Sequence, residues 1–458
     1  MLVKKSIRAG VALFLFIFFN MPYASCNIGP SGPVVFLTLE KTIAIAFLNN
    51  KNIQIQQREI NVARANILEG WSRFFPKVSA DTAYTYNDGS LNQDLIQPKY
   101  AKKDIGVFTG YRNDNKLVGI IKETLYDGGA NVANLKQSEL DLRVQDETLR
   151  AKKLDVEFEA KRLYYGLLLA HETEHVVRNF LRQAEAHYEN VKNKHEQGTV
   201  SRFQLLQAKV RVSNVIPSLV EAVNAVELIK DDIKKLLSLG IWEQIEAEGR
   251  LAYSPIEVNE LLFLEEANRN RPEIILSELG VNISKWSIEL ARSGYLPTIT
   301  GDATYLFRSD YLNNIFTPKH SNWTVGGQVS FPVFDSMETK AKIDAARSRY
   351  DEAGLEEENV REWTAVNIRR ACLDLIQTAA LISSQEDNIV EAKEALRLSE
   401  IGYDNGVATN LEVLDAQVAL SRAERNLFEG VYDYLMAEAF LARTIGRGYL
   451  VEETYSGQ

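Results

Sequence analysis

The sequence is short of cysteine, of basic charge and of long hydrophobic runs. Its 458 residues contain two cysteines, Cys26 and Cys372, which are too few for a disulfide framework. A net charge of −10 argues against a nucleic-acid-binding protein, because such proteins normally carry a basic patch. After residue 30, no stretch approaches the roughly 20 apolar residues of a membrane-spanning helix. If the chain crosses a membrane, it must therefore do so with strands.

The N-terminus has the pattern of a secretory signal over residues 1–25. Three basic residues among the first eight precede the apolar run Val11–Phe19, which is too short to span a membrane as a helix. Small residues follow, up to Cys26. Cleavage at this point would leave Cys26 as a lipidated N-terminal residue of the bacterial lipoprotein type. The alternative is cleavage nearby, which leaves a free thiol or removes it.

Proline is absent from two runs of 65 residues, Ala130–Lys194 and Met337–Ile401. At 1.5 Å per residue each run would form a helix of roughly 100 Å, and so long a pattern is typical of a coiled coil. Each run ends at a turn, around Gly198 and Gly406, and a second amphipathic pattern follows at once. Two helical hairpins are therefore predicted, with a kink at Pro217 in the first one only.

The two predicted hairpin tips are copies of one another. Residues 198–210 align with residues 406–418 at a displacement of 208 residues, and four of the aligned positions are identical. Self-similarity at so long a period indicates two copies of one large unit. The chain accordingly divides into a first structural repeat, residues 26–240, and a second structural repeat, residues 241–458.

Each repeat also contains two stretches in which apolar and polar residues alternate, as they do in strands with two different faces. These stretches are residues 78–86 and 117–125 in the first repeat, and residues 299–307 and 323–331 in the second. A helical pattern, Leu39–Ser72, precedes the first pair, and the polar residues 87–116 predict an exposed loop. The link between the repeats, residues 240–260, has no clear period.

Four strands of about nine residues are long enough to cross a bilayer on a tilted path, but the smallest closed membrane barrels need eight strands. An open sheet edge is not tolerated in lipid, because its backbone groups would remain unpaired. The strands therefore predict an oligomer, unless they form a small soluble sheet instead. Aromatic residues at the outer positions and Thr, Asp and Gln at the inner positions favour the membrane barrel.

At this point the chain resembles the TolC-type outer-membrane efflux proteins over nearly its whole mature length. The pieces that carry the resemblance are Arg271-Pro272-Glu273, Tyr295-Leu296-Pro297, Phe331-Pro332-Val333-Phe334-Asp335 and Gly402–Gln417. The resemblance implies a mainly α fold with membrane β-structure, in which a homotrimer closes a 12-stranded β-barrel in the outer membrane. It further implies that the long helices continue this barrel as an α-helical tunnel through the periplasm.

The resemblance also implies roles for residues at the tips. Glu412 and Asp415 match the acidic residues that ring the periplasmic constriction, and three residues of spacing put them on one helix face. Such a ring favours cations, although the same pair would also fit an ordinary solvated acidic face. Tyr403 matches the tyrosine that holds the closed tip through hydrogen bonds. The sequence departs from the pattern at Ala408, where a basic residue is usual, and at Gln204, where an acid is usual.

The function that the resemblance implies is a passive exit duct of a tripartite efflux or type I secretion system. Its expected partners are a periplasmic adaptor, an inner-membrane pump of the RND or ABC type, and outer-membrane lipid. No cofactor and no nucleic acid are expected. The sequence does not separate small molecules from proteins as cargo, because the inner-membrane partner sets the cargo.

Two other functions fit parts of the sequence. The segment His171-Glu172-Thr173-Glu174-His175 has the His-Glu-x-x-His pattern of zinc proteases, with two imidazoles one helical turn apart. It lies inside the long helical run, and the other histidines show no metal-ligand spacing, so a solvated helix face is favoured over a metal site. A periplasmic coiled-coil adaptor would have the same long hairpins but would lack the four strands.

Overall fold

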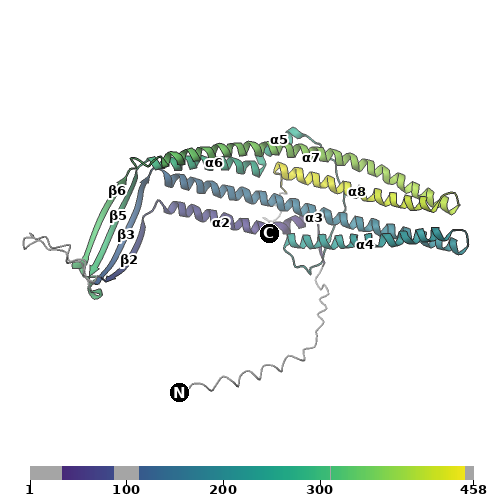
Figure 1. Cartoon of the computed structure of the whole chain (residues 1–458), viewed down its shortest axis with the longest axis horizontal. Coiled ribbons are helices and arrows are strands. Elements are labelled where there is room, and N and C mark those ends of the chain that lie inside the picture. The colour runs from purple at the N-terminus through teal and green to yellow at the C-terminus, as the bar shows by residue number, and fades with distance from the viewer. Residues whose placement is uncertain (1–33, 87–112, 310, 449–458) are drawn as a thin grey trace, which may run out of the picture.

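The protein is a long, narrow structure with strands at one end and the tips of two helical hairpins at the other (Figure 1). The computed structural model describes residues 34–86, 113–309 and 311–448. The predicted signal segment, Cys26 and residues 87–112 of the predicted loop lie outside the described residues.

Two very long helices run the length of the helical part. Helix α3 spans Ala130–Glu196 and α7 spans Glu338–Asp404, each with 67 residues. Each turns back into a helix of 36 residues, α4 at Arg202–Leu237 and α8 at Asn410–Ile445. All the corresponding bounds are 208 residues apart, which is the displacement found between the two tips in the sequence. The helices themselves begin and end up to three residues from the ends of the proline-free runs.

The segment before each strand pair is two helices, and the single helix predicted over residues 39–72 is wrong in this respect. Helix α1, Leu39–Asn49, ends at Asn50, and α2, Lys51–Ser72, begins directly after it. The Asn50 side chain accepts from the Asn52 N–H at 2.9 Å and donates to the Leu236 carbonyl at 3.2 Å, so it caps α2 and ties it to α4. The second repeat has the same break between α5, Glu260–Asn270, and α6, Pro272–Arg292.

The four predicted strands form one antiparallel sheet in the order β2-β3-β5-β6. Their bounds are Lys77–Tyr86, Asn113–Asp127, Thr298–Ser309 and Ser321–Ser330. Strand β3 begins at Asn113, because residues 113–116 pair with β2 and residues 115–116 also pair with β5, so the predicted loop ends earlier than residue 116. Phe331 was predicted in the last strand but follows its end. Within the described residues, the outer edges of β2 and β6 are unpaired.

The link between the repeats is more regular than its sequence predicts. Strand β1, Val35–Leu37, pairs in parallel with β4, Ile245–Ala247, so the start of the first repeat is joined to the start of the second. Leu37 and Ile245 are buried together in the core below this pair. Three short 3-10 helices complete the described chain: η1, Ser293–Tyr295; η2, Leu312–Asn314; η3, Pro318–His320.

The helices form a curtain four columns wide. Near the strands, α2 packs on α3, α3 on α6 and α6 on α7; towards the tips, α4 packs on α3, α3 on α8 and α8 on α7. Helices α2 and α4 therefore form one edge column, and α7 forms the other. The four helical columns of the curtain thus equal the four strands of the sheet in number.

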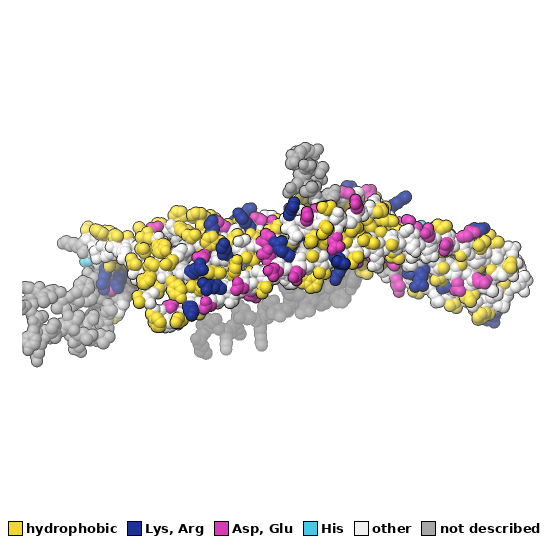
Figure 2. All heavy atoms as spheres, turned by 90° about the horizontal axis from the view of Figure 1, so that it is seen from above, with side chains coloured by type: hydrophobic (Ala, Val, Ile, Leu, Met, Phe, Trp, Pro, Cys, Tyr) yellow, Lys and Arg dark blue, Asp and Glu magenta, His cyan; other side chains and the backbone are white. Residues whose placement is uncertain are grey.

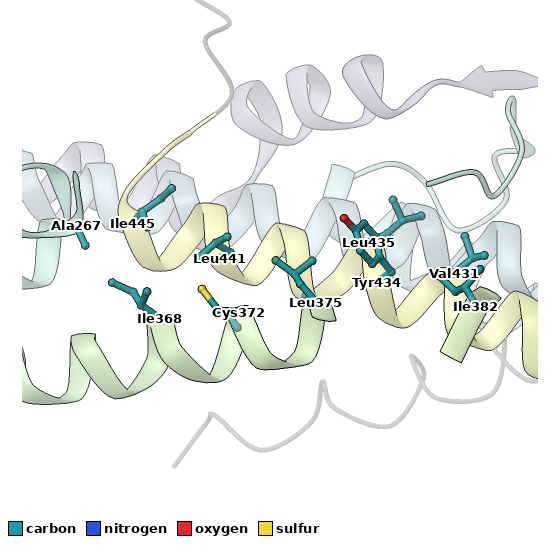
Figure 3. Packing of buried hydrophobic residues seen from close by; sticks show 12 residues of the cluster. Ala267, Ile368, Cys372, Leu375, Ile382, Val431, Tyr434, Leu435, Leu441 and Ile445 are labelled. Atoms are coloured by element: carbon teal, nitrogen blue, oxygen red, sulfur yellow. The ribbon is translucent and has the colours of Figure 1, made fainter. Parts of the chain in front are cut away.

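Two equivalent cores hold the middle of the molecule. In the second repeat, α7 and α8 bury Ile368, Leu375, Tyr434 and Leu441 against Ala267 of α5 (Figure 3). Leu167, Val226 and Ile233 occupy positions 208 residues earlier than Leu375, Tyr434 and Leu441 in the core of the first repeat. The Tyr434 hydroxyl accepts a hydrogen bond from the Ile256 N–H at 3.0 Å, which attaches the segment between the repeats to α8.

The expectation that no helix after residue 30 is apolar enough to span a membrane is wrong for α4. This helix is long and apolar enough to cross a membrane by length and composition. It continues across Pro217 without interruption. Its large apolar side chains lie on an exposed stripe along the edge of the curtain: Phe203, Leu206, Val210, Ile216, Val220, Val223 and Leu228. A partner that covers this edge explains the composition as well as a membrane does.

Candidate functional site

The tip of the first hairpin is a tight turn built on one glycine. Gly198 adopts the left-handed conformation, with φ of +77°, and its N–H donates to the His195 carbonyl at 2.9 Å. The Thr199 N–H donates to the Lys194 carbonyl, also at 2.9 Å. This pair of bonds satisfies the last carbonyls of α3, as in a Schellman motif. Ser201 then caps α4, because its hydroxyl accepts from the Gln204 N–H at 3.3 Å.

The second tip repeats this geometry. Gly406 has φ of +75° and donates to the Tyr403 carbonyl at 3.2 Å, while the Val407 N–H donates to the Gly402 carbonyl at 2.8 Å. Thr409 caps α8. The turn residues Gly198 and Gly406 therefore occupy the left-handed position that glycine tolerates best.

Replacing Gly406 with alanine is expected to loosen the second tip by about 1–2 kcal/mol, the cost of the left-handed conformation for a residue with a Cβ. No heavy atom lies within 4 Å of the position that the Cβ would occupy, so steric clash adds nothing. Hydrogen exchange at the Val407 amide measures the effect. Gly354, inside α7, also has open space around it, and Gly354→Ala should stabilise the helix instead. Equal effects of the two substitutions would contradict this account.

The two carboxylates expected at the constriction lie in the first turns of α8. Glu412 Oε2 accepts from the Thr409 N–H at 2.6 Å, and the Thr409 hydroxyl accepts from the Glu412 N–H at 3.3 Å. These two bonds form a capping box, which fixes the Glu412 side chain. Asp415 is exposed, and among the described residues it has neither an ion pair nor a hydrogen bond through its side chain. The two carboxylates thus share a face, and of the two only Glu412 is held by hydrogen bonds among the described residues.

Tyr403 is buried between the hairpins, with 7% of its surface exposed. Its ring packs with Val191, Ala208 and Val413, and burial raises the pKa of its hydroxyl. The hydroxyl has no hydrogen-bond partner in the described part of the chain, and the same is true of Gln204 Oε1. The two residues that the resemblance connects with the latch are therefore both at the tip, but they are not bonded to each other.

A polar joint connects the two hairpins behind Tyr403. His187 of α3 is buried, and its Nε2 lies 2.6 Å from Asn410 Oδ1 at the start of α8. Asn410 Nδ2 donates to Gln207 Oε1 of α4 at 3.2 Å. Three helices are thus held by one chain of side-chain hydrogen bonds.

An ion pair closes the joint nearer the turns. Asp404 Oδ1 accepts from Asn190 Nδ2 and from Lys194 Nζ, each at 3.0 Å. The Asn190 bond and then the Lys194 bond hold the pKa of Asp404 below its usual value. Lys194 Nζ also lies 4.3 Å from the centre of the Tyr403 ring, which adds a cation–π contact.

The sequence analysis missed these joint residues. The available signal is weak: His187, Asn190 and Lys194 follow one another at helical spacing on one face of α3, a polar stripe on a helix with an otherwise apolar inner face. Nothing in the local sequence says that their partners lie more than 200 residues away on α7 and α8.

The His-Glu-x-x-His segment lies on α3, where Glu174 pairs with Arg178 and His171 Nε2 lies 3.6 Å from Glu246. Among the described residues, no group of three His, Cys, Asp or Glu side chains is placed to hold a metal ion. The segment lies within α3, and its charged side chains pair with neighbouring charges.

Comparison with known proteins agrees with this geometry. The chain is 22% identical over 434 residues to the "probable outer membrane lipoprotein SilC" of Salmonella typhimurium, covering 90% of this chain and 86% of that protein. It is also 22% identical to the "alkaline protease secretion protein AprF" of Pseudomonas aeruginosa, covering 87% of this chain and 82% of the other. The first of these relatives is named for the outer membrane and the second for protease secretion.

The fold is shared with solved outer-membrane proteins. The structure of VceC from Vibrio cholerae superposes with a TM-score of 0.77 at 17% identity, covering 90% of this chain and 96% of that one. The outer membrane efflux protein family matches residues 42–237 and 263–447, which include all the long helices and all four strands of the antiparallel sheet. The chain belongs to the outer membrane efflux protein family.

Proposed function

We propose that three copies of the chain form an exit duct, which passively carries cargo from a periplasmic adaptor and an inner-membrane pump to the exterior. The observation that carries this proposal is the sheet β2-β3-β5-β6, whose two outer edges are unpaired in the part of the chain that the structure describes. Four strands do not close a membrane barrel, but twelve do, and closure removes every unpaired edge from lipid. Pairing of β6 with β2 of the next copy achieves this.

The outer surface of the sheet supports a place in the membrane. Valines 78, 325 and 329 are exposed on the strands, and hydrophobic side chains gather at this end of the molecule in Figure 2, whereas charges are interspersed further along. Exposed aromatic side chains lie at or near both ends of the strands: Phe75, Tyr84, Tyr86, Tyr126, Tyr311, Phe316, Trp323, Phe331 and Phe334. Aromatic girdles on both sides of an apolar band are typical of outer-membrane barrels.

The helical curtain supports the same assembly. Its edge helix α4 carries the exposed apolar stripe described above, and the opposite edge helix α7 carries another: Leu355, Trp363, Val366, Leu373, Ile376 and Leu398. If α7 of each copy packs on the edge column of α2 and α4 of the next, both stripes are buried. Three curtains of four columns then give a tunnel with the same threefold symmetry as the barrel.

The tips provide the constriction of this duct. Glu412 and Asp415 from three chains would place six carboxylates around the axis, and such a ring favours cations. The adaptor would open the tips by docking on the hairpins. Lipidation at Cys26 is part of the proposal, because the similar protein SilC is named a lipoprotein.

Single-channel recording in planar bilayers, with the oligomer mass measured in detergent, tests the proposal. We expect small, long-lived, cation-preferring openings from a particle with about three times the mass of the mature chain. A monomer that does not conduct would overturn the duct and would favour a periplasmic adaptor. Labelling by a fatty acid that is lost in Cys26→Ser tests the lipid anchor separately.

A further inference from the structure

The buried joint between the hairpins contains one imidazole, the side chain of His187, and the ordinary pKa of an imidazole lies close to neutral pH. His187 is 7% exposed, Asn410 is 2% exposed, and the bond of 2.6 Å between them connects residues 223 positions apart. Because Asn410 Nδ2 donates to Gln207, Asn410 Oδ1 faces the imidazole as an acceptor. His187 Nε2 is therefore the donor, and the neutral ring already makes this bond without taking up a proton.

The surroundings of His187 oppose a positive charge. Burial lowers the pKa of the imidazole, and it outweighs the bond to Asn410, which favours the charged ring. Among charged groups, Glu400 and Asp404 of α7 favour protonation and Lys194 of α3 opposes it. The Tyr403 ring of α7 also faces the imidazole, with 5.2 Å between the ring centres. The neighbours contributed by α8 and α4 are the neutral amides of Asn410 and Gln207.

We propose that the His187–Asn410 bond holds the two hairpins of each chain together in the closed duct, and that proton uptake by His187 releases them. This inference rests on the proposed function, since it assigns a positioning residue to the tip of the same duct. When the hairpins separate, the ring enters water and binds a proton without the burial cost. Acid therefore favours the open tip.

The sign of the effect follows from the direction of the pKa shift. Above the ordinary histidine pKa of 6.5, the ring is neutral in both states and the closed tip has its full stability. Below this value the separated ring is protonated first, so the stability of the closed tip is lost as the pH falls. Asp404 titrates far below this window, because its bonds keep its pKa below 3.8.

The test is the open probability of the reconstituted trimer in a planar bilayer between about pH 8 and pH 5.5, the range in which histidine titrates. For wild type we expect opening to increase below pH 6.5, by up to about tenfold per pH unit for each histidine that must be protonated. His187→Gln keeps a donor for Asn410 but cannot take up a proton, so its openings should be rare and independent of pH. His187→Ala should open often at every pH.

Two controls separate this inference from other causes. His175→Gln, an exposed residue of the same helix, should keep the wild-type response. Asn410→Asp offers the protonated ring a carboxylate, so acid should close this variant instead of opening it. A wild-type response retained in His187→Gln, or a flat profile in wild type, would overturn the joint and leave the duct intact. Complete absence of conductance in wild type would overturn the duct itself.

Discussion

Replacing Glu412 with glutamine and Asp415 with asparagine together is expected to remove most of the cation preference of the duct. The double substitution takes six negative charges from the constriction of a trimer. A single pair of charges 4 Å apart interacts by about 1 kcal/mol even in water, and about 1.4 kcal/mol corresponds to a tenfold change in an equilibrium. We therefore expect the cation-to-anion permeability ratio to fall about tenfold. Block of the duct by multivalent cations should weaken as well.

The choice of glutamine follows from the capping box at Thr409. Glutamine keeps the bond to the Thr409 N–H, whereas alanine would remove the charge and the cap at once. The matched control is Glu424→Gln, which removes one charge further along α8. If the permeability ratio of the double variant equals that of wild type, Glu412 and Asp415 form an ordinary solvated face.

Much of the fold is predictable because its signals are local. Missing prolines, helical periodicity and the turn glycines Gly198 and Gly406 are properties of short windows, and each of them holds in the structure. The displacement of 208 residues between the repeats then gives a second, independent prediction of where each helix begins and ends. Agreement between the two copies is stronger than either pattern alone.

The errors share a different cause. The break at Asn50 depends on a bond to Leu236, 186 residues away, and the parallel pair β1–β4 joins segments from different repeats. Residues 113–116 are polar and are typical of a loop, but they form a strand because they pair with β2, and residues 115–116 also with β5. In each case tertiary contacts override the local preference.

The candidate site likewise has features that the sequence predicts and features that it does not. The turn glycines and the acidic face of α8 are visible in the sequence, because spacing alone puts Glu412 and Asp415 on one side of a helix. The joint of His187 with Asn410 is not visible, because it requires the relative position of two hairpins. The Tyr403 hydroxyl is buried without a partner among the described residues, and its role in a latch stays a prediction.

The edge of the helical curtain offers the second large effect. Val220 lies in the exposed apolar stripe of α4, with 54% of its surface exposed in a single chain. If α7 of the next copy covers this stripe, Val220→Glu buries an unpaired carboxylate at three interfaces, each at a cost of several kcal/mol. We expect trimers to be lost and monomers to appear in native mass spectrometry of the detergent-purified protein.

A substitution in the stripe on the opposite edge tests the same interface without altering α4. Ile376→Glu alters α7, and it should abolish trimers to the same extent, because the same interface is approached from its other side. Ser218→Glu adds the same charge two residues from Val220 but off the stripe, so it should leave the trimer unchanged. Helix content measured by circular dichroism shows whether each chain still folds. Trimers that survive both stripe substitutions would mean that the curtains associate through other faces, or that the pairing of β2 with β6 holds the copies together without the stripes.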